Sequence, residues 1–401
     1  PLPSNASDLR DTRELHLFNG GPPLRLLRLW GRFDPDHQQG VRRARIVACV
    51  GWLPLRLPAL LPIPAGHDEV WRAFLRDASV HARSLIVAPL LVLAEAACIP
   101  LLGELAHTFR DRGLIPAAEL PAYERVVHSI RRLRDWWLVE AVAVVLAYGL
   151  AVLLVTHVPT SFLPDWHRSA SEGAPLGRSP ASWWAMLVSL PLLLVLLLGW
   201  AWRIFLWALY LWRVSRLDLR LVASHPEGAG GLMFVSYSLN SFSLLGIAIG
   251  VIVAGLELAH LLAGGDITPE QLGRVTFGSI VFVLVLFTAP LLCFCAPLLR
   301  TWRQGVKAYG ALAQRVGTSL EDRWMRAPPG PETAEPLSSP DFSAVADLFQ
   351  SVEKAYQMRV VPVELRSAFT LAMATALPFG VVALALVPFD KVLEKMVGLF
   401  L

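Results

Sequence analysis

The residues best suited to chemistry lie in a polar, glycine-rich segment, residues 216–232, which separates two long apolar stretches. His225 supplies an imidazole, and Glu227 supplies a carboxylate two positions later. Three of the four residues after Glu227 are glycine. Backbone amides in such a turn can form a nest for phosphate or another anion, with His225 as a titratable gate. The segment matches neither the G-x-G-x-x-G pattern nor a Walker A loop, and no lysine is close.

A structural role for the same segment is the alternative, and we favour it. The alternation of apolar and charged residues over 217–221 predicts an extended stretch. The spacing Ser224-x-x-Glu227 fits a capping box, in which both side chains bond to exposed backbone amides. The glycines would then let one backbone approach another, or bend the chain into the next apolar stretch.

Two charged residues fall inside consecutive apolar stretches. Arg56 and Glu95 lie near mid-depth, where an ionisable side chain is a functional candidate by default. An ion pair between them would offset the desolvation of both charges, as a structural pair or as part of a functional site. Alternatively, a short first stretch leaves Arg56 near the membrane surface. Arg203 stands among tryptophans, and we expect it to snorkel to the inner interface.

The stretch 233–262 combines polar and small residues. Asn240 and Ser241 belong to a serine-rich beginning, and Gly246 and Gly250 then stand four residues apart. This spacing is typical of tight helix packing. It is also compatible with a polar vestibule that leads to a narrow constriction in a pore.

Glu257 and His260 lie one helical turn apart near the other end of that stretch. They could line an outer vestibule of a pore, but an interfacial position explains them equally simply. The chain contains no H-E-x-x-H, no G-x-S-x-G and no carboxylate-rich cluster in or beside the apolar stretches. We therefore expect no enzymatic activity and no metal or cofactor.

The composition is that of a membrane protein. Of 401 residues, 55% are hydrophobic and 17% are charged, and the mean hydropathy is +0.51. Soluble domains have about 25% charged residues. The net charge of +4 comes mainly from arginines near the ends of apolar stretches. Membrane orientation explains these arginines better than nucleic-acid binding does. The four cysteines all lie in apolar stretches and form neither a disulfide framework nor a zinc spacing.

Seven stretches are candidates for crossing a bilayer, because about 20 apolar helical residues span the hydrocarbon core. They are residues 44–64, 83–103, 136–157, 183–213, 233–262, 275–299 and 368–389. The first is the weakest candidate, since Arg56 and four prolines interrupt it. It must be kinked, shielded or re-entrant.

Basic residues gather at one set of loop ends and predict the orientation. They are Arg42, Arg43, Arg45, Arg110, Arg112, Arg125, Arg131, Arg132, Arg134, Arg213, Arg216, Arg220, Arg300, Arg303 and Lys307. The opposite loops, 161–180 and 263–273, contain only Arg168 and Arg178. The positive-inside rule then places the N-terminus in the cytoplasm and the C-terminus outside.

Four parts follow from this arrangement. Residues 1–43 form a cytoplasmic N-terminal segment, and 44–299 hold six spans with a cytoplasmic hairpin at 104–135. Residues 300–366 form cytoplasmic helices around a Pro-rich linker, with a new helix beginning near Ser339-Pro340. Residues 367–401 hold the last span and an amphipathic tail.

Three segments resemble a recurrent pattern of uncharacterised bacterial multi-pass membrane proteins. Residues 216–232 resemble Leu-Asp-Leu-x-Leu-Val-x-x-His-Pro-Asp-x-x-Gly-Gly-Leu, with Glu227 in place of the usual aspartate. Residues 74–81, Phe-Leu-Arg-Asp-Ala-Ser-Val-His, and 212–216, Trp-Arg-Val-Ser-Arg, are also similar to that group. The resemblance implies a multi-pass protein of a bacterial inner membrane and brings no established activity.

We therefore expect an all-α polytopic integral membrane protein, with about seven transmembrane helices and cytoplasmic helical extensions. The polar-then-small pattern of 233–262 favours a homo-oligomeric channel or pore-like transport protein for an ion or small solute. The alternative is a scaffold or sensor that transports nothing and binds a partner through its cytoplasmic helices.

Overall fold

The computed structural model describes residues 17–18, 37–60, 67–157, 165–167, 179–326 and 340–386. Within these ranges the regular secondary structure is helical throughout, so the all-α prediction is confirmed. The α-helices are α3 (His37–Leu60), α4 (His67–Arg76), α5 (Ala78–His81), α6 (Ala88–Asp111), α7 (Leu120–Arg134), α8 (Trp137–His157), α9 (Pro180–Trp184), α10 (Leu190–Val214), α11 (Tyr237–Ser241), α12 (Ser243–Leu262), α13 (Pro269–Thr288), α14 (Cys295–Glu321), α15 (Pro340–Tyr356) and α16 (Leu365–Leu386).

Short segments of other helical geometry interrupt this series. The π-helices are η1 (Ala82–Val87), η6 (Ala185–Ser189) and η9 (Asp322–Arg326). The 3-10 helices are η2 (Ala117–Glu119), η4 (Asp165–His167), η7 (Met233–Ser236) and η8 (Ala289–Phe294). Because η1, η6 and η8 join α-helices without a loop, the long apolar helices change pitch along their length without ending.

Five helices of the described part are long and apolar enough to cross a membrane. They are Ala78–Asp111, Pro180–Val214, Ser243–Leu262, Pro269–Glu321 and Leu365–Leu386. A sixth results if α7 and α8, which meet at a bend of 43°, count as one span. The described part of the stretch 44–64 is not among them, so the described residues contain five or six candidate spans where the sequence suggested about seven. The arginines and prolines of α3 explain its exclusion, because they lower its hydropathy.

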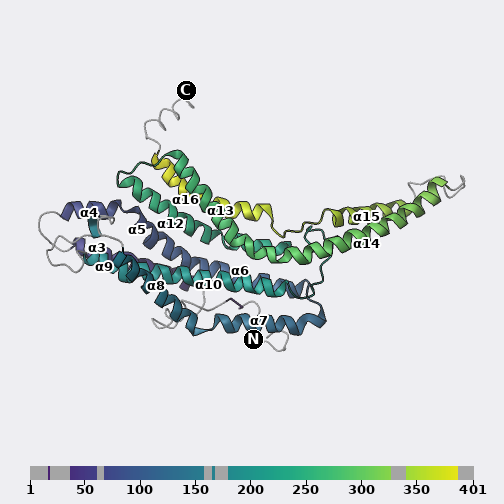
Figure 1. Ribbon diagram of the computed structural model, residues 1–401, viewed down its shortest axis with the longest axis horizontal. Helices are drawn as coiled ribbons and strands as arrows, with labels where there is room; N and C mark the ends of the chain where they lie inside the picture. Colours follow the sequence, from purple (N-terminus) through teal and green to yellow (C-terminus); the bar gives the residue numbers. More distant parts are fainter. Residues whose placement is uncertain are drawn as a thin grey trace, which may run out of the picture.

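The helices form an elongated bundle (Figure 1). In this view α12, α13 and α16 lie on one side of α6 and α10, and α7 lies on the other. Tyr123 of α7 donates to the carbonyl of Ala106 and pairs with the hydroxyl of Tyr210, at 2.9 and 3.1 Å. These buried bonds hold α7 against α6 and α10.

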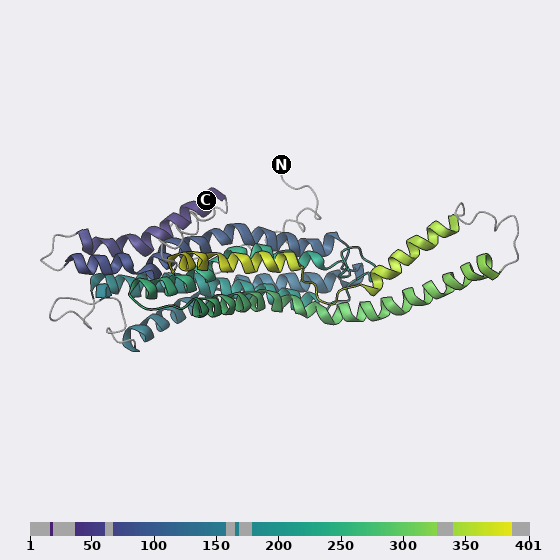
Figure 2. The same ribbon diagram turned by 90° about the horizontal axis from the view of Figure 1, so that it is seen from above.

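Helices α14 and α15 leave the bundle as an antiparallel pair, which we call the arm (Figures 1 and 2). The helix start near Pro340 is confirmed, and α14 continues the span at 275–299 as a polar helix beyond the bundle. Prolines at 290 and 297 flank the change from α13 through η8 to α14. The two ends of the bundle are named after this feature: the arm end carries α14 and α15, and the far end carries α4, α5, α9 and the α12–α13 turn.

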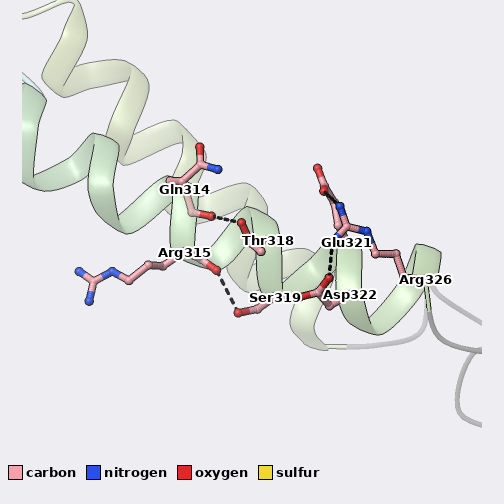
Figure 3. Close-up of polar contacts among 7 residues, drawn as sticks. All are labelled: Gln314, Arg315, Thr318, Ser319, Glu321, Asp322 and Arg326. Atoms are coloured by element: carbon pink, nitrogen blue, oxygen red, sulfur yellow. Dashed lines mark hydrogen bonds and ion pairs between the residues drawn. The ribbon is translucent and has the colours of Figure 1, made fainter.

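The tip of α14 is held by contacts within its own chain segment (Figure 3). The guanidinium of Arg326 lies 2.8 Å from a carboxylate oxygen of Asp322 and 3.6 Å from one of Glu321. Thr318 and Ser319 donate their hydroxyls to carbonyls one turn earlier. All of these contacts are local, within one or two turns of the helix.

Candidate functional site

The 216–232 segment lies at the arm end and connects three other parts of the chain. The amide of Arg220 donates to the carbonyl of Leu114 in the α6–α7 turn, at 2.8 Å. The hydroxyls of Ser224 and Tyr309 in α14 are 2.7 Å apart. The amide of Arg359, between α15 and α16, donates to the carbonyl of Gly228 at 2.6 Å. The segment therefore fastens α14, and the residues that follow α15, to the bundle.

Glycine is required here for its backbone conformation. Gly228, Gly230 and Gly231 have φ angles of +75°, +62° and +94°, which side chains with a Cβ adopt at a cost. A Cβ on Gly230 would also lie 3.1 Å from the terminal methyl of Met358 and 3.3 Å from Leu298. Gly230 thus lets side chains from α14 and from the α15–α16 connection approach the turn closely.

His225 and Glu227 take structural positions. A carboxylate oxygen of Glu227 lies 2.6 Å from the guanidinium of Arg112, with both side chains about one-third exposed. The amide of Glu227 donates to Nδ1 of His225 at 3.3 Å. The predicted capping box is therefore wrong, because the carboxylate pairs with Arg112 and the Ser224 hydroxyl with Tyr309.

Several amides expected to form an anion nest are used inside the turn. Those of Val222, His225, Gly228 and Leu232 donate to carbonyls of the same segment. No bound anion is needed to satisfy these donors. A structural role for the 216–232 segment is sufficient to explain these hydrogen bonds.

The polar beginning of the 233–262 stretch joins helices. The side-chain amide of Asn240 donates to the hydroxyl of Ser367, and the carbonyl of Ser241 accepts from the thiol of Cys98. The hydroxyl of Ser236 accepts from the amide of Glu364, where α16 is about to begin, at 2.8 Å. These groups bond to α6 and α16, and the break at Phe242 separates α11 from α12.

Gly246 and Gly250 bring α12 against α16. A Cβ on Gly246 would lie 2.7 Å from Oγ1 of Thr375, and one on Gly250 would overlap the carbonyl oxygen of Thr375. The small residues thus permit the tight helix packing expected from their spacing. Within one chain, this glycine face is occupied by α16.

Glu257 and His260 lie towards the far end of α12. Glu257 is partly exposed, and His260 is exposed with its ring against Gly265 in the α12–α13 turn. They sit near the boundary of the helix, where an interfacial position was one of the two expectations.

Glu95 and Arg203 form a buried ion pair between α6 and α10. A carboxylate oxygen of Glu95 lies 3.2 Å from the guanidinium of Arg203, whose side chain is 4% exposed. The side chain of Arg56, its expected partner, lies outside the described residues. The expectation that Arg203 snorkels is wrong, because the carboxylate and the ring of Trp200 hold it inside the bundle.

Sequence reasoning missed a cavity at the far end, whose wall is largely apolar with a few polar groups. The cavity has a volume of about 230 Å³, and Arg83, Ser84, His167 and Ser189 contribute its polar groups. Arg83 had been treated only as the boundary of a span. The signal that could have found this region is the segment 74–81, which the sequence singled out for its resemblance and which leads into the cavity wall.

Asp77 organises that wall. Its carboxylate accepts from the hydroxyl of Ser79 at 2.6 Å, the amide of Val80 at 3.3 Å and the indole of Trp166 at 3.0 Å. The indole contact joins α5 to η4, which are far apart in the sequence. Asp77 is 6% exposed, so a carboxylate is stabilised inside the protein by these three donors.

The described residues contain no group of three or more His, Cys, Asp and Glu side chains that could hold a metal ion. Comparisons of the chain with family models, curated proteins and solved structures find no match. The helices and their apolar lengths define the class: this is an all-α, multi-pass membrane protein in contact with a lipid bilayer.

Proposed function

We propose that the protein is a self-associating scaffold of a bacterial inner membrane, whose arm meets the arm of a second copy in the cytoplasm. The orientation rests on the basic residues of the arm end, since cytoplasmic ends of membrane helices are enriched in arginine and lysine. It puts the arm inside and the end of α16 outside.

The observation that carries the proposal is the arm itself. It is only two helices thick, and no other described helix accompanies its distal part (Figures 1 and 2). It exposes Leu312 by 37%, Phe349 by 42% and Tyr356 by 52%. Two helices alone bury little apolar surface, whereas four helices enclose a core.

The charges of the arm favour a second copy as the occupant. Arg303, Lys307 and Arg315 are distributed along α14, whereas Asp347 and Glu353 stand on α15. Two arms related by a two-fold axis can place the basic helix of one copy beside the acidic helix of the other. Such an isologous contact is the commonest way in which soluble homodimers form.

The pore hypothesis remains a prediction with weaker support. Its main argument was the small-residue face at Gly246 and Gly250, and α16 of the same chain occupies that face. The polar residues at the beginning of the stretch bond to neighbouring helices. A pore would have to form along another surface.

The test is the mass of the full-length protein in lipid nanodiscs, measured by light scattering at several concentrations. The proposal predicts about twice the chain mass of 44.1 kDa for the protein alone, after subtraction of lipid and belt protein. The double substitution Leu312→Asp and Phe349→Asp should give a single chain. Gln350→Asp adds a charge beside Phe349 without removing apolar surface and should remain dimeric. A monomeric wild type, or a dimer that survives the double substitution, overturns the proposal.

A further inference from the structure

The cavity at the far end lies where two membrane helices change to π-helical geometry. Arg83 and Ser84 belong to η1, and Met186 and Ser189 belong to η6. Gly51 of α3 completes the wall on a third side. Short π-helical segments within α-helices are rare and occur frequently at functional sites. Because two π-helical segments line this cavity, we consider it the strongest candidate binding site among the pockets of the described residues.

Arg83 brings a positive charge to this cavity. Its Nε donates to the carbonyl of Ser79 at 3.1 Å, and its Nη2 to the hydroxyl of Ser79 at 3.3 Å. The nearby Asp77 directs its oxygens to Ser79, Val80 and Trp166. Among the described residues no carboxylate lies within ion-pair distance of Arg83, and the hydrogen bonds of its guanidinium go to neutral acceptors, while the charge of Asp77 acts on it from farther away.

The remaining polar groups of the wall are serine hydroxyls and the imidazole of His167. Ser189 donates its hydroxyl to the carbonyl of Gly51 at 2.6 Å and keeps lone pairs, and Nδ1 of His167 lies 2.8 Å from the hydroxyl of Ser182. Ser84 is 7% exposed and also lines the cavity. The rest of the wall is hydrocarbon, from Leu55, Val80, Met186, Leu190, Leu192 and Leu193.

One guanidinium in a largely apolar wall selects for one anionic group on an apolar body. A cavity of about 150 Å³ holds benzene, so about 230 Å³ holds about nine non-hydrogen atoms. We propose that the cavity binds a small apolar monocarboxylate, with its carboxylate on Arg83 and its body against the leucines of α10. A dicarboxylate would bury a second charge without a partner. This inference does not depend on self-association of the arm.

The test measures binding of benzoate, which has nine non-hydrogen atoms, to the full-length protein in nanodiscs by titration calorimetry. Benzyl alcohol serves as the neutral probe of similar shape. The wild type should bind benzoate at least tenfold more tightly than benzyl alcohol. Arg83→Gln should abolish this preference, and Arg72→Gln, which removes an exposed arginine of α4 at the same end, should preserve it.

A second variant keeps the test informative if Arg83→Gln fails to fold. A Cβ on Gly51 would lie 3.7 Å from Ser84, an ordinary contact distance, so Gly51→Leu should fill the cavity and leave Arg83 in place. It should reduce benzoate binding at least tenfold while the thermal unfolding of the protein stays cooperative. Equal affinities for the two probes in the wild type, or unchanged benzoate binding in Gly51→Leu, overturn the proposal.

Discussion

The two polar regions of this apolar protein differ in how their polar groups are satisfied. At the arm end, the 216–232 segment directs its hydroxyl, carboxylate and several amides to partners in the same chain. At the far end, Asp77 is satisfied in the same way, and Arg83 donates to Ser79 but also lines a cavity and forms no ion pair with a carboxylate among the described residues. Polar groups that bond only within the chain fasten helices together, whereas the charge that also lines a cavity is the one that we propose for a ligand.

Substitution of Asp77 should have the largest effect on stability. Asp77→Ala removes the acceptor of Ser79, Val80 and Trp166 in the wall of the cavity. We expect a loss of about 5 kcal/mol in the free energy of unfolding, since three hydrogen bonds are lost and hydrogen bonds to charged groups contribute about 1.5–3 kcal/mol each. Asp218→Ala removes an exposed carboxylate at the arm end and should change stability by less than about 0.5 kcal/mol. Denaturant unfolding in detergent measures the stability of both variants. Equal losses of stability would show that Asp77 is no more important than an exposed carboxylate.

At the arm end, substitution of two nearby glycines distinguishes the cost of backbone conformation from the cost of crowded packing. Gly228→Ala meets no atom within 4 Å, so it should cost only the left-handed conformation, about 1 kcal/mol. Gly230→Ala should cost about 2 kcal/mol, because the new methyl group also crowds Met358 and Leu298. Unfolding of both variants under one set of conditions gives the difference. If Gly228→Ala is the more damaging, the packing described for Gly230 is wrong.

The smallest effect should come from the ion pair of Arg112 and Glu227. Both side chains are about one-third exposed, and such pairs contribute about 0.5 kcal/mol. A double-mutant cycle with Arg112→Met and Glu227→Gln should return a coupling of that size, reduced further by high salt. A coupling above about 2 kcal/mol would mean that the pair is a principal fastening of the arm end.

Sequence patterns were sufficient to predict the helical class and the helix start at Pro340. They also marked the stretch 44–64 as the weakest candidate span, and the described part of it, in α3, is not among the helices apolar enough to cross a membrane. Sequence patterns could not find the partner of Glu95, since Arg203 lies more than 100 residues away in the sequence and meets it only through packing.

The candidate sites were harder to predict for a related reason. Glycines and a histidine at 225–231 look like a binding loop, and only the contacts of Glu227 and Ser224 reveal a fastening role. The cavity depends on two π-helical segments and on an indole that reaches Asp77 from residue 166. No local pattern in the sequence specifies either feature.

Site-specific photo-crosslinking in the native membrane tests the central claim, self-association through the arm, most directly. Phe349 is replaced by the photoreactive p-benzoylphenylalanine, and Phe277 of α13, which is 69% exposed against 42% for Phe349, serves as the control position. The account predicts a cross-linked product of two chains from position 349, with its attachment site in α14 or α15 of the second copy. Absence of that product, or an equal yield from position 277, would contradict it.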